Sequence, residues 1–218
     1  MKKIHQIAIL FFLTAVLFAQ DTETPTLTKP AASSSDNASL EIDFTLPEAA
    51  FSGTVKMTFT QTGGDDDPND PHIITFNSTF ETAAQHIGSL DGTNLSNNVT
   101  IVSSVNTDAT NNDALADGAI YTVIIEYQDA AGNGLMSASN TLFEYDITAP
   151  TISSTAPAQD ASIKDAKVSY TLSEAVASGT VTFTQTSGSE DDESPHRQDL
   201  AGAELNTGAH DNITLTEN

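Results

Sequence analysis

Apolar and polar residues alternate along several short stretches of the chain. Leu40, Ile42 and Phe44 are separated by acidic residues, and a similar alternation recurs between residues 119 and 128. A period of two places successive side chains on opposite faces of a strand, so this pattern predicts strands with one buried face. The predicted strands cover residues 25–28, 39–46, 53–62, 72–76, 98–103, 119–128 and 139–146.

Part of this pattern occurs twice, as an internal sequence repeat. Residues 44–55 (FTLPEAAFSGTV) recur as residues 170–181 (YTLSEAVASGTV), and the string TFTQT at 58–62 recurs at 182–186. The first copy carries two additional residues between these strings. Two is the side-chain period of a strand, so the insertion keeps the flanking residues on one face only if the segment is a strand.

Seven short strands with turns between them predict an all-β fold, an immunoglobulin-like antiparallel β-sandwich. Tyr121 stands where a tyrosine corner is expected, with its hydroxyl bonded to upstream backbone. Residues 24–147 form the first predicted module and residues 148–218 the second. The second has no counterparts of the strands at 119–128 and 139–146, so we expect it to be incomplete and the sequence to be a fragment of a longer protein. The alternative is a half-domain that receives a donor strand in trans.

The first 19 residues have the pattern of a secretory signal peptide. Lys2 and Lys3 precede an apolar run at residues 7–18, and Ala19 ends it before a polar stretch. The run is shorter than the roughly 20 residues of a membrane span. The alternative is an uncleaved N-terminal anchor. We expect cleavage after Ala19, a secreted or cell-surface location, and no transmembrane span in the mature chain.

The charge and composition narrow the classes of function. The chain contains seven Lys and Arg and 30 Asp and Glu, which gives a net charge of −23. Nucleic-acid binding is therefore not expected, because phosphate contacts need clustered basic residues. The chain has no Cys, which excludes disulfides, thiolate metal sites and thiol catalysis. It contains no nucleophile elbow, phosphate-binding loop or dinucleotide fingerprint, and we expect no enzyme activity.

The repeated polar residues leave two interpretations open. Acidic residues crowd the loop at 65–70 and its counterpart at 190–193, where their oxygens suit Ca²⁺ or simply keep a solvated loop soluble. Four histidines fall at repeat-related positions, which predicts turn or capping roles, because no two have the spacing of a zinc site. These pairs are His72 with His196 and His86 with His210.

Two segments resemble a known family. Residues 127–133 (YQDAAGN) resemble the hairpin near the end of bacterial immunoglobulin-like repeats, and residues 145–152 (YDITAPTI) resemble the linker between such repeats. The resemblance covers nearly all of residues 24–218. It implies a module that stacks in tandem within long, acidic surface proteins and adhesins, and that has neighbouring modules of the same protein as its partners.

The same resemblance implies a calcium site at the junction between modules. The candidate ligands are Asp129 and Asn133 in the hairpin and Asp146 in the linker. We expect the hairpin to project from the same end of the module as Asp146, so that the three side chains share one Ca²⁺. The alternative is that Asp129 and Asn133 form the turn and Asp146 is solvated. No other cofactor is predicted.

The leading functional hypothesis is a non-catalytic structural or adhesive module, a stalk or spacer of tandem immunoglobulin-like domains in a secreted or cell-surface bacterial protein. A surface glycan or protein is the ligand class that an adhesin implies. The alternative is an accessory or carbohydrate-binding region of a secreted hydrolase. The absence of Trp and a 6% content of aromatic residues leave few rings for stacking on sugars.

Overall fold

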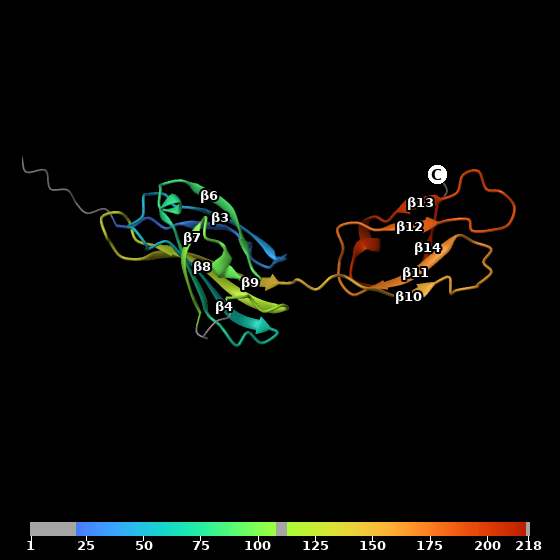
Figure 1. Cartoon of the computed structure of the whole chain (residues 1–218), viewed down its shortest axis with the longest axis horizontal. Coiled ribbons are helices and arrows are strands. Elements are labelled where there is room, and N and C mark those ends of the chain that lie inside the picture. The colour runs from blue at the N-terminus through green and yellow to red at the C-terminus, as the bar shows by residue number, and fades with distance from the viewer. Residues whose placement is uncertain (1–20, 108–112, 217–218) are drawn as a thin grey trace, which may run out of the picture. The chain divides into compact units, whose positions relative to one another are not determined.

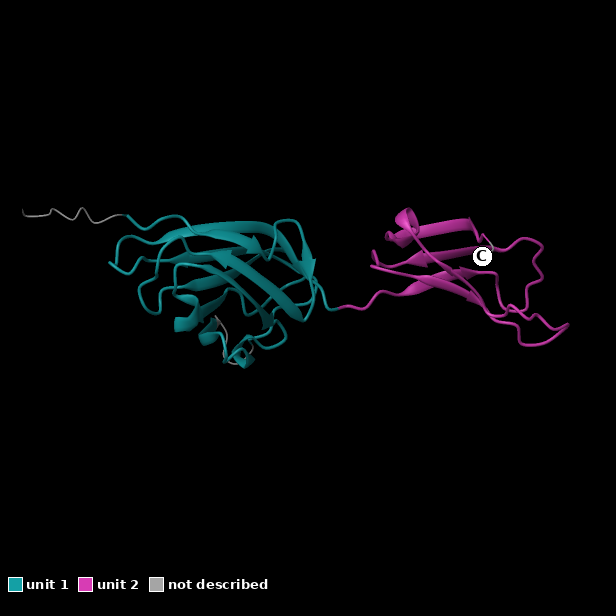
Figure 2. Ribbon diagram, turned by 90° about the horizontal axis from the view of Figure 1, so that it is seen from above, with its two compact units in different colours: residues 1–147 teal, residues 148–218 magenta. Residues whose placement is uncertain are grey.

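A computed structural model describes residues 21–107 and 113–216. The predicted signal peptide, residues 1–19, lies outside the described residues. The chain divides between Ile147 and Thr148 into two compact units, unit 1 before this boundary and unit 2 after it (Figure 2). In the part of the chain that the structure describes, no helix has the length and apolar character needed to cross a bilayer.

The described residues of unit 1 form two sheets, neither of which closes on itself (Figure 1). The smaller has the order β1 (Thr26–Lys29), β3 (Ser39–Thr45), β6 (Gln85–Asp91). The larger has the order β2 (Ser35–Asp36), β9 (Met136–Tyr145), β8 (Ala119–Tyr127), β4 (Lys56–Gly64), β5 (His72–Phe76), β7 (Val102–Thr107). Neighbours are antiparallel throughout, except β2 and β9, which run parallel. Two 3₁₀ turns, η1 (Ser78–Phe80) and η2 (Leu95–Asn97), lie in the connections.

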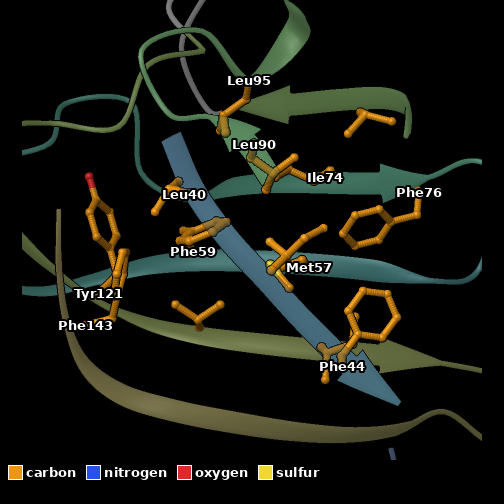
Figure 3. Packing of buried hydrophobic residues seen from close by; sticks show 14 of the residues in the cluster. Leu40, Phe44, Met57, Phe59, Ile74, Phe76, Leu90, Leu95, Tyr121 and Phe143 are labelled. Atoms are coloured by element: carbon orange, nitrogen blue, oxygen red, sulfur yellow. The ribbon is translucent and has the colours of Figure 1, made fainter. Parts of the chain in front are cut away.

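The two sheets of unit 1 enclose one hydrophobic core (Figure 3). Phe44 from β3 meets Phe76 from β5 with ring centroids 5.2 Å apart. Met57 and Phe59 from β4 lie in the same cluster, and both are fully buried. Burying each such side chain stabilises the fold by about 1.5–3 kcal/mol, so the pairing of the two sheets is the main source of stability for unit 1.

The alternation that predicts strands is confirmed where it is clearest. Buried and less buried residues alternate along β3 and β8, and β8 lies inside its sheet, between β9 and β4. The strand predicted at residues 98–103 is misplaced, because residues 98–101 form a turn after η2 and β7 begins at Val102. The sequence patterns did not predict β2 or β6.

Residues 148–216 of unit 2 form two smaller sheets. One has the order β10 (Ile152–Ala156), β11 (Lys167–Leu172), β14 (Gly208–Thr214), and the other pairs β12 (Thr180–Phe183) with β13 (His196–Asp199). The 3₁₀ turn η3 (Gly202–Leu205) precedes β14. Its core is small: three buried residues, Val168, Tyr170 and Leu172, with partly buried apolar residues around them.

Candidate functional sites

The structure brings two of the three predicted calcium ligands together. One carboxylate oxygen of Asp129 accepts the backbone N–H of Asn133 at 2.9 Å, and the other accepts the Asn133 side-chain amide at 2.5 Å. These hydrogen bonds, from the Asn133 backbone first, lower the pKa of Asp129, although burial opposes them. The two residues therefore close the turn between β8 and β9, which is the alternative that the sequence left open.

Asp146 lies at the opposite end of unit 1 from this turn. In the β8–β9 pair, Tyr127 faces Met136 beside the turn, and Ala119 faces Tyr145 at the far end. Because β9 runs back antiparallel for ten residues at about 3.3 Å each, roughly 30 Å separate the two ends. The expectation that the hairpin and Asp146 share one end of the module is wrong, and the three residues form no common site.

Two carboxylates close to Asp146 in the structure accept backbone N–H groups. Both oxygens of Asp36 accept backbone N–H groups, from Asn37 at 2.9 Å and Glu41 at 2.8 Å. Asp117 accepts the N–H of Ile147 at 2.8 Å. Within residues 21–107 and 113–216, no group of three His, Asp or Glu side chains is arranged to hold a metal ion. Calcium binding by any one of Asp129, Asn133 and Asp146 stays a prediction from the sequence, and the bonds of both Asp129 oxygens to Asn133 argue against it.

A buried polar cluster joins the acidic loop after β4 to the centre of the larger sheet. We call it the Asp67 cluster: Gln61, Asp67, His72 and Tyr121. Asp67 accepts the Tyr121 hydroxyl at 2.6 Å and bonds His72 Nε2 at 2.8 Å. Its own N–H donates to the Gln61 side-chain oxygen at 3.0 Å. Asp67 thus bridges strands β4, β5 and β8 from a position in the loop.

Tyr121 also forms the predicted bond to upstream backbone. Its hydroxyl oxygen accepts the N–H of Ala116 at 2.9 Å while its hydrogen goes to Asp67. The tyrosine-corner contact is therefore confirmed, and Asp67 is an additional acceptor that sequence analysis did not identify. The hydroxyl therefore acts both as a donor and as an acceptor. These two bonds hold the segment that precedes β8 against the loop after β4.

Burial and hydrogen bonding act in opposite directions on Asp67. Burial raises the pKa of its carboxyl group, but bonds from Tyr121, the Asn69 N–H and His72 outweigh burial and hold the pKa below its usual value. The pKa of Tyr121 is raised, by burial first and by its bond to the carboxylate second. Asp67 is therefore held as an anion and Tyr121 as a neutral donor.

The Asp67 cluster is closed to a substrate. Asp67 is 4% exposed, and His72 and Tyr121 are fully buried. The Nδ1 atom of His72 is buried with no hydrogen-bond partner among the described residues. An acid–base pair needs access to a reacting group within about 3 Å, and side chains as buried as these offer none. The cluster fixes a loop to the core.

Unit 2 repeats the Gln and His bonds of this arrangement in its loop, without a counterpart of the Tyr121 bond among the described residues. His196 Nε2 bonds the Asp191 carboxylate at 2.9 Å, and the Asp191 N–H donates to the Gln185 side-chain oxygen at 2.9 Å. We call Gln185, Asp191 and His196 the Asp191 cluster. Here the side chains of Asp191 and His196 are 39% and 45% exposed. The shared spacing of Gln, Asp and His in the two copies is the sequence signal that could have identified both clusters.

The second pair of repeated histidines has a turn role in both units, as predicted. His86 Nε2 bonds the backbone oxygen of Thr82 at 2.9 Å, and His210 Nε2 bonds that of Asn206 at 2.8 Å. Each imidazole also packs on the aromatic residue opposite it, Phe44 or Tyr170. These contacts hold the segment before β6 and β14 against the neighbouring strand.

Comparisons of the chain with protein-family models, with curated proteins and with solved structures found no match.

Proposed function

We propose that the chain is a non-catalytic structural and adhesive part of a secreted or cell-surface bacterial protein, a stalk or spacer of tandem immunoglobulin-like domains. Its partners would be the neighbouring modules of the same protein. The spacer keeps other parts of the protein at a distance from the surface, so its principal physical task is to resist extension. A contact in unit 1 supports this proposal most directly.

That contact places β2, the second strand of unit 1, beside β9, its last strand. β2 and β9 run parallel, with Ser35 opposite Glu144. The Ser33 N–H donates to the Thr141 oxygen at 3.0 Å, and the Glu144 N–H donates to the Ser34 oxygen at 2.9 Å. This ladder binds the N-terminal segment of the unit to the strand that leads out of it.

Side-chain bonds extend the ladder beyond β2. The Asn140 side-chain amide donates to the backbone oxygens of Leu27 at 3.1 Å and Pro30 at 2.7 Å. At the other end, the Asp146 N–H donates to the Asp36 oxygen at 3.0 Å. Residues 27–36 are therefore fastened along the whole second half of β9.

Tension applied through a tandem protein would load this ladder in shear. The chain enters unit 1 before β1 and leaves after β9, so the two ends pull parallel neighbours in opposite directions. In shear, the bonds of a ladder share the load and must break together, whereas peeling breaks them one at a time. The parallel β2–β9 pair is thus suited to a module that bears force.

The two-sheet core and the Tyr121 corner support the immunoglobulin-like classification of unit 1 within this proposal. The repetition of strand register and of the Asp67 cluster in unit 2 supports the tandem arrangement. Phe59 faces His72 in the β4–β5 pair, and Phe183 faces His196 in the β12–β13 pair.

Single-molecule extension of residues 21–218 tests the proposal. We expect unit 1 to unfold in one step that releases about 40 nm of chain, the length of residues 26–145 when extended. Gradual lengthening at low force would contradict a load-bearing role. A glycan array tests the alternative: saturable binding of one sugar class would favour a carbohydrate-binding region over a spacer.

A further inference from the structure

We propose that unit 2 binds an extended polypeptide segment with the pattern of β8, which adds as a strand to the open edge of β12. The occupant is a partner segment in which Tyr, Val, Ile and Tyr alternate with polar or smaller residues, as at 121–127. Strand addition to an exposed edge is an established mode of peptide recognition.

The pairing partners of β4 and β12 differ on one edge only. In unit 1, β4 pairs with β5 on one edge and with β8 on the other. In unit 2, β12 pairs with β13 in the equivalent register, and among the described residues no strand pairs with its other edge. An unpaired edge presents a row of backbone donors and acceptors to an incoming strand.

β4, which has a partner on both edges, is longer than β12, which has a partner on one edge. β4 continues to Gly64, and its residues 60–64 pair with β8 but not with β5. The identical string TFTQT occurs in unit 2, yet β12 ends at Phe183 and residues 184–188 are outside any strand. A segment of the same sequence is a strand where the partner is present, so an added strand should extend β12.

The apolar face beside this edge is open. A cavity of about 450 Å³ lies between the sheets of unit 2, lined by Val168, Tyr170, Leu172, Val181 and Leu200 among others. In unit 1 the corresponding space is filled by the inward side chains of β8, which are fully buried: Tyr121, Val123, Ile125 and Tyr127. Phe59 is fully buried beneath them, whereas its counterpart Phe183 is only partly buried.

The Asp191 cluster supplies a polar anchor for the added strand. In unit 1, Gln61 faces Tyr121 in the ladder, and the Tyr121 hydroxyl reaches Asp67. In unit 2, Asp191 makes the same bonds to Gln185 and His196, and its carboxylate is still accessible to solvent. A tyrosine opposite Gln185 would therefore place its hydroxyl on Asp191.

The test adds a peptide of residues 115–129 to the full chain, without its signal peptide, and measures binding by calorimetry and protection by hydrogen exchange. We expect one peptide per chain and new protection over residues 180–188. A peptide with Tyr121→Phe should bind about ten-fold more weakly, because it loses one hydrogen bond to a carboxylate. A peptide with Ile125→Asp should not bind.

A chain variant completes the test. Asp191→Asn should weaken binding of the natural peptide and leave binding of the Tyr121→Phe peptide unchanged, which identifies the pair directly. Absence of binding at millimolar peptide would overturn the proposal. So would protection of residues 180–188 that rises with chain concentration and no peptide, because a second copy would then be the occupant. Peptide-induced loss of protection in β4 would overturn it as well, since it would show exchange with β8 in unit 1.

Discussion

Removing one buried tyrosine hydroxyl at a time should separate the contribution of the Asp67 cluster to stability from the contribution of the rest of the core. Tyr121→Phe removes only the oxygen that bonds Asp67 and Ala116 and leaves the ring in place. Tyr145→Phe makes the same chemical change in the same sheet. The Tyr145 hydroxyl is buried and has no hydrogen-bond partner in the part of the chain that the structure describes.

The structure gives opposite expectations for the two variants. A hydrogen bond to a charged acceptor contributes about 1.5–3 kcal/mol, and loss of the acceptor for the Ala116 N–H adds about 1 kcal/mol. We therefore expect Tyr121→Phe to lower the free energy of unfolding of unit 1 by about 3 kcal/mol. An unpaired buried hydroxyl has a desolvation cost, so Tyr145→Phe should leave stability unchanged or raise it by about 1 kcal/mol.

Hydrogen exchange at increasing urea concentration measures both variants in the intact chain. Protected amides of β4 and β8 report the global unfolding of unit 1, and amides of β11 report unit 2 separately. Equal losses in the two variants would refute the reasoning, because ring packing or general disruption would then explain both. An unchanged Tyr121→Phe variant would show that the Asp67 cluster contributes nothing to stability.

Three further predictions concern the loops of unit 1. Gly64→Ala should lower the free energy of unfolding by about 3 kcal/mol or more, measured by heat or urea, because φ is +71° and a methyl group would lie 2.1 Å from a backbone oxygen. The control, Gly132→Ala, has φ +79° in open space and should lower it by about 1 kcal/mol. Equal losses in the two variants would contradict this prediction. Millimolar Ca²⁺ should leave the melting temperature unchanged, because Asn133 already occupies both Asp129 oxygens; a rise that Asp129→Asn abolishes would restore a calcium site. The pKa of Asp67 is lowered in the folded protein, so Asp67 stabilises unit 1 above the unfolded pKa of about 3.9, and this stabilisation is lost as pH falls through the lower folded pKa. Asp67→Asn should therefore weaken the loss of stability at acid pH, measured by unfolding at several pH values. An unaltered pH dependence would contradict the assignment.

Strands with regular alternation could be predicted from the sequence, and β6 shows why others could not. In β6 the inward residues are His86 and Leu90, whereas Ile87 is 71% exposed. Polarity alone therefore assigns the wrong faces. His86 is accepted in the core because its Nε2 bonds a backbone oxygen and its ring packs on Phe44. That compensation depends on tertiary contacts, which a hydropathy pattern does not contain.

The candidate sites likewise divide into contacts between residues near in sequence and contacts that depend on the pairing of distant strands. The Tyr121 corner could be predicted because both partners lie within six residues of each other. The bond from Tyr121 to Asp67 joins residues 54 positions apart, so it depends on the pairing of β4 with β8. The calcium hypothesis failed as a single site for a related reason. It required Asp129 and Asp146 at one end of unit 1, and the length and direction of β9 separate them.

The direction dependence of mechanical unfolding tests the proposed spacer function most directly. The chain has no Cys, so introduced cysteine pairs can attach handles at defined positions. Handles at Asp21 and Ile147 load the β2–β9 ladder in shear, and handles at Asn37 and Ile147 peel it from one end. We expect a higher rupture force for the first pair than for the second, at the same loading rate. Equal rupture forces would contradict a load-bearing role for the parallel β2–β9 pair.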